Sequence, residues 1–368
     1  MKFSLSSAPS AGTSSRNSYA DVLAEGWAAH LAKRVASAPT VISTFAGAGG
    51  SSLGYSMAGY RERLAVELDD NAVATFRLNF RATPVYHGDI MQLSSAECLQ
   101  RADLKVGELD VLDGSPPCQG FSTAGKRALD DPRNQLFREY VRLLRGLQPK
   151  AFVMENVGGM VKGKMKLIFA DIMRELRASG YRVSARLMNA MFFHVPQARE
   201  RLIFVGVRDD LKADPSHPRP AGRPFSAGTA LWGANNDPAQ LSWLLNYIKE
   251  HAKFNDYWQR LKPGDTLADV GGIGNNRHAG FSYRKYRSDR PAYTIMKSDG
   301  AGGPSKAMHW SERRGFTVAE FKRFASFPDE FRFAGEWGDA VQRIGNSVPP
   351  LFMRAIAEHL RHEVLGAM

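Results

Sequence analysis

Short apolar runs alternate with helical patterns over much of the chain. Five of these runs predict buried strands, at residues 41–45, 64–67, 110–113, 151–154 and 202–207. Each run ends at or close to a Gly, a Pro or a charged residue. Apolar positions at helical spacing predict helices between them, for example at residues 136–147 and 167–179. Such alternation is typical of an α/β fold with a doubly wound, mostly parallel sheet, in which ligands bind at the carboxyl ends of the strands.

Changes in this pattern divide the chain into four segments. They are residues 1–40, 41–208, 209–313 and 314–368. The first is a Ser-rich tail followed by a helical stripe, and the second is the main α/β domain. The third is loop-heavy and predicts a smaller domain, whereas helical periodicity returns in the fourth, which we expect to rejoin the main domain. The apolar face of the helix predicted in the first segment comprises Val22, Leu23, Trp27, Leu31 and Val35. In the smaller domain, we assign Trp232, Trp243 and Trp258 to core packing.

The composition narrows the class of protein. The chain has 368 residues, a formal net charge of +12 and a pI of about 9.7, which favours a polyanionic partner, although a merely basic protein would show the same surplus. Two cysteines, Cys98 and Cys118, are too few for a disulfide framework and indicate a reducing, cytoplasmic compartment. No apolar run approaches the roughly 20 residues that span a bilayer, so we expect no membrane partner.

A glycine-rich turn follows the first predicted strand and opens a helix. It contains Phe45, Gly47, Gly49 and Gly50. Glycines there let a ligand approach the backbone, although a simple connection between two elements would look the same. Glu67 ends the next strand, where a carboxylate can bind ribose hydroxyls, and Asp89 offers a further acid at the same edge. Together these residues favour an adenosine cofactor.

A loop stiffened by two prolines carries Cys118 after the strand at 110–113. A free cysteine is usually a small buried hydrophobe, which is the role assigned to Cys98. No other Cys or His stands near Cys118 at metal-ligand spacing, so we expect no metal site and interpret Cys118 as a nucleophile. The end of the loop, residues 120–126, could close over a substrate.

A carboxylate and two arginines stand at two further strand ends. Glu155 follows the strand at 151–154, where a partly desolvated acid can donate a proton, although a helix cap or an ion pair would use the same residue type. Arg199 and Arg201 come just before the strand at 202–207, at alternate positions that lie on one side of an extended chain. This pattern predicts a clamp for an anion or a carbonyl oxygen.

The motifs resemble, in order, the signatures of cytosine-5 DNA methyltransferases that use S-adenosylmethionine. They are residues 45–50, Pro117-Cys118, Glu155-Asn156-Val157, Gln197-x-Arg199-x-Arg201, the stretch 315–329 and Gly345-Asn346-Ser347-Val348. The resemblance covers roughly residues 41–360. It implies the fold of S-adenosylmethionine-dependent methyltransferases, with the loop-rich segment 209–313 as the target-recognition domain. Ser43 departs from the aspartate that many members carry in the first strand.

The resemblance also implies roles for individual residues. Cys118 would attack the cytosine, Glu155 would protonate its ring nitrogen, and Arg199 and Arg201 would support the target base. The cofactor pocket would comprise Phe45, Gly47, Gly49, Gly50, Glu67, Leu68, Asp89, Ile90, Leu136, Asn346 and Val348. The DNA-binding residues would be Gln119, Ser122 and Lys126 in the cysteine loop and Arg284, Lys285, Arg287 and Arg290 in a basic, aromatic cluster of the smaller domain.

The sequence therefore predicts an enzyme that flips a cytosine out of double-stranded DNA and methylates its C5 within a short specific sequence. We expect a monomer in the bacterial cytoplasm, associated with the nucleoid, alongside which a cognate restriction endonuclease could act separately. One alternative is a tRNA cytosine-5 methyltransferase, although the Cys-Phe-Thr tripeptide usual in those relatives is absent. The other is a catalytically silent DNA-binding relative, which the intact Cys118, Glu155 and Asn346 disfavour.

Overall fold

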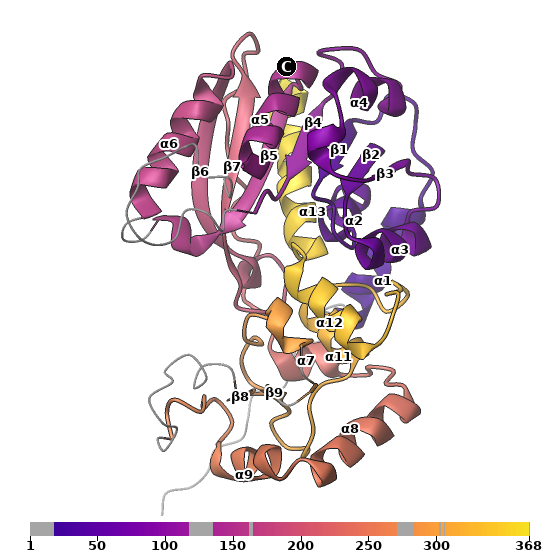
Figure 1. Cartoon of the computed structure of the whole chain (residues 1–368), viewed down its shortest axis with the longest axis vertical. Coiled ribbons are helices and arrows are strands. Elements are labelled where there is room, and N and C mark those ends of the chain that lie inside the picture. Colours follow the sequence, from indigo (N-terminus) through magenta and orange to yellow (C-terminus); the bar gives the residue numbers. More distant parts are fainter. Residues whose placement is uncertain are drawn as a thin grey trace, which may run out of the picture.

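The computed structural model describes residues 18–117, 135–161, 165–270, 283–301, 303–304 and 306–367. Figure 1 shows an elongated molecule in which a large sheet domain stands above a smaller part built mostly of helices and loops. Cys118, Gln119, Ser122 and Lys126 lie outside the described residues. Within the described ranges, no helix has both the length and the apolar character needed to cross a membrane.

A seven-stranded sheet forms the large domain, in the order β3-β2-β1-β4-β5-β7-β6. The strands are β1 (Thr40–Thr44), β2 (Arg61–Glu67), β3 (Val85–His87), β4 (Val111–Gly114), β5 (Ala151–Val157), β6 (Tyr181–Asn189) and β7 (Glu200–Arg208). β1 to β5 are parallel, whereas β7 runs antiparallel to β5 and β6. The strand order reverses between β1 and β4, where doubly wound sheets leave a crevice for ligands. The predicted fold class and the five predicted strands are confirmed.

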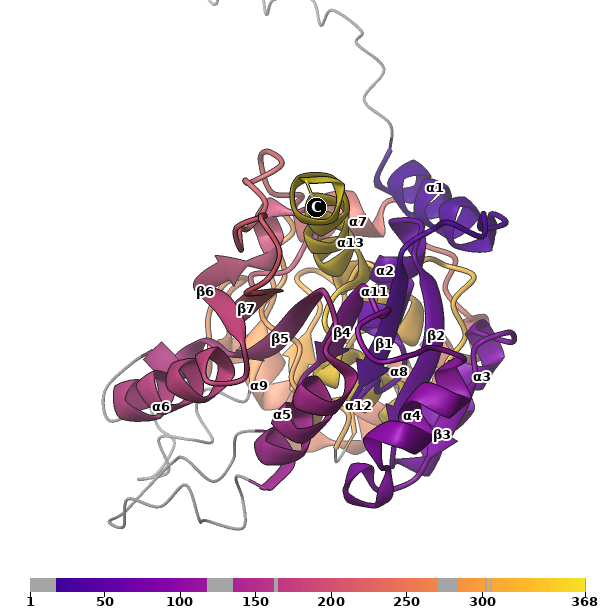
Figure 2. The same cartoon turned by 90° about the horizontal axis from the view of Figure 1, so that it is seen from above.

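Alternate side chains along each strand enter two separate cores. On β5, Ala151 and Val153 face one core, whereas Phe152 and Met154 face the other. The first core lies beneath α1 (Tyr19–Leu31), α2 (Gly50–Met57) and α13 (Pro350–His359), and the second beneath α4 (Ser95–Ala102), α5 (Gln135–Leu147) and α6 (Met165–Arg177). Figure 2 shows the two groups of helices on opposite faces of the sheet. Central strands are therefore buried on both faces, which explains their continuous apolar sequence.

Several elements of the large domain were not predicted from the sequence. They are β6 and the single turns η1 (Ile90–Gln92), η4 (Gly158–Val161) and η5 (Ala190–Phe192), whereas α3 (Asp70–Asn79) is one of the helices expected between the strands. β6 is an edge strand, and polar residues such as Arg182, Ser184 and Arg186 interrupt its apolar positions. Because only one side of such a strand is covered, its sequence carries a weaker apolar signal than that of a central strand.

The smaller part contains more helix than the loop-heavy sequence predicted. It comprises α7 (Ala227–Leu231), α8 (Pro238–Glu250), α9 (Ala252–Arg260), η6 (Lys297–Asp299) and a two-stranded parallel sheet of β8 (Arg284–Lys285) and β9 (Ala307–Met308). The chain then forms α11 (Val318–Phe324), α12 (Trp337–Asn346), α13, η7 (Leu360–Val364) and η8 (Leu365–Ala367). A separate small core gathers Phe254, Leu261, Leu267 and Met308.

Two predictions about apolar positions are wrong. In the N-terminal stripe, helix α1 buries Leu23 as predicted, and Val22 and Trp27 pack against the core, but the helix ends at Leu31, so Leu31 and Val35 are 65% and 64% exposed. In the smaller part, Trp232 is 83% exposed and Trp243 41% exposed rather than buried in a core. A tryptophan is usually buried in part, but its position in sequence does not show which surface covers it.

The carboxyl-terminal helix α13 returns to the sheet domain and packs against α2. A Cβ atom added to Gly54 would lie 2.6 Å from Cβ of Met353 and 2.7 Å from the carbonyl oxygen of Pro350. Only glycine permits this approach of the two helix backbones. Residues 350–359 therefore pack directly on a helix that follows the first strand of the sheet.

Candidate active site

A cavity of about 650 Å³ opens where the carboxyl ends of β1, β2, β4 and β5 meet the start of β7. Its lining residues are Phe45, Ala46, Gly47, Ala48, Gly50, Ser51, Glu67, Asp69, Ser115, Pro116, Pro117, Glu155, Asn156, Val157, Arg199, Arg201, Lys297, Arg343, Gly345, Asn346, Ser347 and Val348. Segments that are far apart in sequence thus line a single cavity. The cavity lies at the edge of the sheet where the strand order predicts a ligand-binding site.

The glycine-rich turn forms one side of this cavity. Its backbone is left-handed at Phe45, Gly47 and Gly49, with φ angles of 55°, 56° and 92°. A Cβ atom on Gly49 would lie 2.5 Å from the Phe80 ring, and one on Gly50 would lie 2.4 Å from the carbonyl oxygen of Val348. The turn therefore requires glycine at positions 49 and 50 because of close packing. Phe45 has a left-handed conformation that is unfavourable for a residue other than glycine, so the backbone is strained at this point.

Glu67 ends β2 and holds the turn in place through its carboxylate. Its Oε2 accepts a hydrogen bond of 2.7 Å from the backbone amide of Gly47, and its Oε1 accepts 2.9 Å bonds from the amides of Leu68 and Asp69. A carboxylate has about four lone-pair positions, so acceptor capacity remains for hydroxyl groups of a ligand. Leu68, the next residue, is not in the lining of the cavity, and its apolar side chain is 63% exposed.

Other predicted cofactor residues lie farther from the cavity. Asp89 caps η1 by accepting a hydrogen bond from the amide of Met91, and Ile90 is buried in the second core. Leu136 packs against that same core from α5. Among the predicted cofactor residues, those that line the cavity are Phe45, Gly47, Gly50, Glu67, Asn346 and Val348.

Glu155 and Arg201 form an ion pair inside the cavity. The distance from Nε of Arg201 to Oε1 of Glu155 is 2.6 Å, and the side chains are only 14% and 11% exposed. The next residue, Asn156, donates a 3.2 Å hydrogen bond from Nδ2 to the carbonyl oxygen of Pro116. This bond ties the end of β5 to the prolines that precede Cys118, so the start of the cysteine loop lies beside the acid.

Arg199 has different partners from Arg201, although both arginines line the cavity. Its side chain is buried, and its two terminal nitrogens donate 2.9 Å hydrogen bonds to the carbonyl oxygens of Ile295 and Gly345. Burial and, to a smaller extent, the nearby charge of Arg201 together lower the pKa of Arg199 to about 9. Arg199, which directly precedes β7, therefore connects that strand to the smaller part through Ile295 and to the end of α12 through Gly345.

Three polar residues near the cavity were not predicted from the sequence. Arg343 lines the cavity from α12 and pairs with Asp69 at 3.0 Å, and Lys297 lines it from η6. Asp113 lies buried at the end of β4, where burial raises the pKa of its carboxyl well above the usual range and the charge of Glu62 raises it further. These contacts join distant segments, so no local pattern indicates them.

The predicted DNA-binding cluster of the smaller part is only partly at the surface. Arg284 is buried and pairs with the buried Asp299 at 2.5 Å, and Nζ of Lys285 lies 3.5 Å from the centre of the Trp258 ring. Both side chains therefore stabilise the fold, and the prediction that they contact DNA is wrong for this arrangement. Arg290 is exposed, and Arg287 is half-buried and pairs with Asp289 at 2.6 Å.

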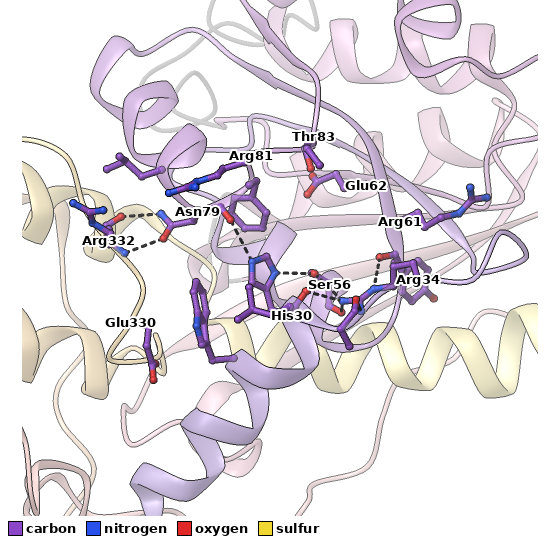
Figure 3. Close-up of a pocket in the computed structure, with 17 residues that line it drawn as sticks. His30, Arg34, Ser56, Arg61, Glu62, Asn79, Arg81, Thr83, Glu330 and Arg332 are labelled. Carbon is purple, nitrogen blue, oxygen red and sulfur yellow. Dashed lines mark hydrogen bonds between the residues drawn. The ribbon is translucent and has the colours of Figure 1, made fainter.

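A second cavity, of about 600 Å³, lies at the opposite end of β2, under the C-terminal end of α1. Figure 3 shows His30 and Arg34 of this region pointing toward Ser56. His30 bonds the Ser56 hydroxyl at 2.8 Å, and the Arg34 guanidinium donates to carbonyl oxygens of residues in or next to α1 and α2, including Ala29, Ser56 and Tyr60. None of the predicted site residues lines this cavity, so its polar groups serve to attach α1 to the sheet domain.

Replacing Arg34 with methionine should lower the free energy of unfolding by about 2 kcal/mol, because carbonyl groups at two helix ends lose a charged donor. Chemical denaturation monitored by circular dichroism would measure the change. Arg81→Met is the matched control, since Arg81 is an exposed arginine at the same cavity and its loss should change stability by about 0.5 kcal/mol or less. Equal stabilities of the two variants would contradict this role of Arg34.

Comparison with known proteins shows the family of the chain. The family model of C-5 cytosine-specific DNA methylases matches residues 39–362. The chain belongs to this family. The methyltransferase is 34% identical over 341 residues to the type II methyltransferase M1.HphI of Haemophilus parahaemolyticus, with 87% of this chain and 86% of the relative covered. It is 32% identical over 369 residues to M.XorII of Xanthomonas oryzae pv. oryzae, with 86% and 83% covered.

Solved structures show the same fold for the methyltransferase. A protein described as a prophage-encoded DNA modification methyltransferase of Escherichia coli superposes with a TM-score of 0.71 at 24% identity, over 89% of this chain and all of that one. The Dnmt2 methyltransferase of S. pombe superposes with a TM-score of 0.58 at 16% identity, over 88% and 99%. The fold is thus the α/β fold of S-adenosylmethionine-dependent methyltransferases, and this protein is a DNA cytosine-5-methyltransferase.

Proposed function

We propose that this methyltransferase transfers a methyl group from S-adenosylmethionine to C5 of a cytosine within a short specific sequence of double-stranded DNA. One observation carries the proposal: the cavity that contains the glycine-rich turn also contains the Glu155–Arg201 pair and the prolines that precede Cys118. A methyl donor, an acid and a nucleophile would thus meet around a single base, as this chemistry requires.

The residues around the glycine-rich turn fit the cofactor. A Cβ atom on Gly47 would meet no atom within 4 Å, so the turn leaves open space on its cavity side. Glu67 retains acceptor capacity for ribose hydroxyls, and the exposed Leu68 offers an apolar surface to an aromatic ring. Asn346 and Val348 close the pocket from the end of α12. When bound, the cofactor supplies the electrophilic methyl group.

The reaction begins with addition of the Cys118 thiolate to C6 of the cytosine. Glu155 donates a proton to N3 as the carbon–sulfur bond forms, and this breaks the aromaticity of the ring and makes C5 nucleophilic. C5 then takes the methyl group, after which a water molecule accepts the C5 proton, the N3 proton returns to Glu155 and the Cys118 thiolate leaves, which restores the ring. Arg201 holds Oε1 of Glu155, so Oε2 is the oxygen that remains for the base.

Double-stranded DNA is the substrate that this chain supports best. The target atom cannot be reached inside a duplex, so the base must be flipped into the cavity, at a cost of a few kcal/mol. The net charge of +12 favours a polyanion, and the relatives named above are type II methyltransferases. By analogy we propose that the enzyme acts as a monomer beside a separate restriction endonuclease that recognises the same sequence.

Bisulfite sequencing of DNA from cells that express the enzyme tests the proposal. We expect methylated cytosines at one short recurring sequence, and their absence would contradict the proposal. A second assay compares methyl transfer from labelled S-adenosylmethionine to duplex DNA and to tRNA, where preference for tRNA would favour the RNA methyltransferase. A covalent adduct on duplex DNA that contains 5-fluorocytosine would exclude a catalytically silent protein.

Replacing Glu67 with alanine should raise the Kd for S-adenosylmethionine by about 10- to 100-fold, because charged hydrogen bonds to the ribose are lost. The rate of the chemical step at saturating cofactor should change less. Isothermal titration calorimetry measures the Kd, and Asp89→Ala is the control, because Asp89 is absent from the lining of the cavity. Equal affinities of the wild type and Glu67→Ala would contradict the assignment of the pocket.

A further inference from the structure

The segment around η6 brings one side chain of the smaller part into the active-site cavity. Lys297 begins η6 and lines the cavity together with Glu155, Arg201 and the end of α12. We propose that Lys297 binds a phosphate of the DNA strand beside the flipped cytosine and thereby contributes to the affinity for DNA. This inference rests on the proposed function, since it assigns to the same site a further contact with its substrate.

Buried contacts hold the backbone of this segment in place. The amide and the carbonyl group of Ile295 are both bound, the amide by Oε1 of Gln197 at 3.1 Å and the carbonyl oxygen by Arg199 at 2.9 Å. Asp299, at the other end of η6, accepts a 2.9 Å bond from the amide of Met296 and pairs with Arg284. The position of Lys297 relative to β7 is therefore fixed from both sides.

Close packing against α12 adds to this restraint. A Cβ atom on Gly345 would lie 2.5 Å from the carbonyl carbon of Met296 and 2.7 Å from the amide nitrogen of Lys297. A Cβ atom on Gly300 would lie 2.3 Å from the carbonyl oxygen of Gly338. Two glycines thus allow the backbone of the η6 segment to contact α12 directly, so little freedom remains for Lys297 beyond its own side chain.

The charges around the cavity distinguish Lys297 from the other cations. Among the described residues, four cationic side chains line the cavity. Arg201 pairs with Glu155, Arg343 pairs with Asp69, and Arg199 bonds two carbonyl groups. In the part of the chain that the structure describes, Lys297 is exposed and makes no side-chain hydrogen bond or ion pair. Its charge is therefore available to a ligand, whereas the charges of the three arginines are already engaged.

A DNA phosphate is the ligand that matches this position. A flipped cytosine stays attached to its strand, so the phosphates on either side of it remain at the mouth of the cavity that takes the base. A lysine ammonium is a compact charge on a flexible stem that binds phosphate without a fixed geometry. Such a contact adds affinity but carries no sequence information.

Charge removal at this position tests the proposal. Lys297→Gln should raise the Kd for duplex DNA and the KM for DNA by about 3- to 10-fold and make the slope of log Kd against log salt shallower by about 0.9. Lys297→Arg should restore both values. The Kd for S-adenosylmethionine and the melting temperature should stay at wild-type values. The control Lys249→Gln removes an exposed lysine of α8 that is not in the cavity lining, and it should leave the salt slope unchanged.

A neutral phosphate locates the contact. The duplex carries the site mapped by bisulfite sequencing, with a methylphosphonate on either side of the target cytosine. At one of these positions the neutral linkage should weaken binding by the wild type about 3- to 10-fold, and binding by Lys297→Gln by less than twofold. Equal losses in both proteins would overturn the inference, as would an unchanged salt slope. A wild type that methylates no DNA would instead overturn the proposed function itself.

Discussion

Replacing Cys118 with alanine should remove methyl transfer, with kcat lower by about 10⁴-fold or more, because no other side chain can form the covalent bond to C6. The Kd for duplex DNA should remain within about twofold of the wild-type value, since the thiol is needed for chemistry rather than for phosphate binding. Transfer of labelled methyl groups to DNA measures the first quantity, and a gel-shift or fluorescence titration measures the second.

The second cysteine of the chain provides a matched control for this result. Cys98 lies on α4 with its side chain fully buried, and burial raises the pKa of its thiol to about 12. A thiol of that kind does not ionise at neutral pH, so Cys98→Ala should keep its activity and the adduct with 5-fluorocytosine. Strong residual turnover in Cys118→Ala, or loss of the adduct in Cys98→Ala, would show that the nucleophile has been wrongly assigned.

Replacing Glu155 with glutamine should lower kcat by about 10²- to 10⁴-fold, because the amide cannot donate the proton that N3 requires. The shape of the side chain and the contact between its Oε1 and Nε of Arg201 would be kept, so KM for DNA and Kd for S-adenosylmethionine should change little. Rapid-quench measurements of a single turnover would separate the chemical step from binding and product release.

A glutamate outside the cavity is the control for this variant. Glu175 lies on α6 and pairs with Arg145 at 2.7 Å, outside the lining of the active-site cavity. Glu175→Gln should therefore leave kcat near the wild-type value. If Glu155→Gln raised KM tenfold and left kcat unchanged, Glu155 would be a binding residue, and the proton would have to come from another group.

The sequence predicted the sheet well because its central strands are buried on both faces. Ile42 and Val41 enter different cores, so apolar residues occupy consecutive positions in β1 and mark the strand. The glycine-rich turn was equally visible, since a positive φ angle at Gly49 and close contacts at both Gly49 and Gly50 require glycine. Local sequence is informative where local geometry alone selects the residue.

Contacts between distant segments were not predictable in this way. Arg284 and Lys285 have the sequence of a basic surface, but Asp299 and Trp258 supply a carboxylate and a ring that allow them to be buried. Asp69 and Arg343 pair across the cavity from α3 and α12, and no local pattern couples them. The same reason applies to Arg199, whose partners Ile295 and Gly345 come from two other parts of the chain.

The packing of α13 against α2 has a consequence for the synthesis of the enzyme. A chain that has been translated only as far as the smaller part already has the glycine-rich turn and Glu67, but Asn346, Val348 and α13 are still missing. One side of the proposed donor pocket is therefore contributed by residues that are translated long after the glycine-rich turn. A polypeptide that stops before α12 and α13 should bind the methyl donor poorly, so activity should appear only after this part of the chain has folded onto the sheet.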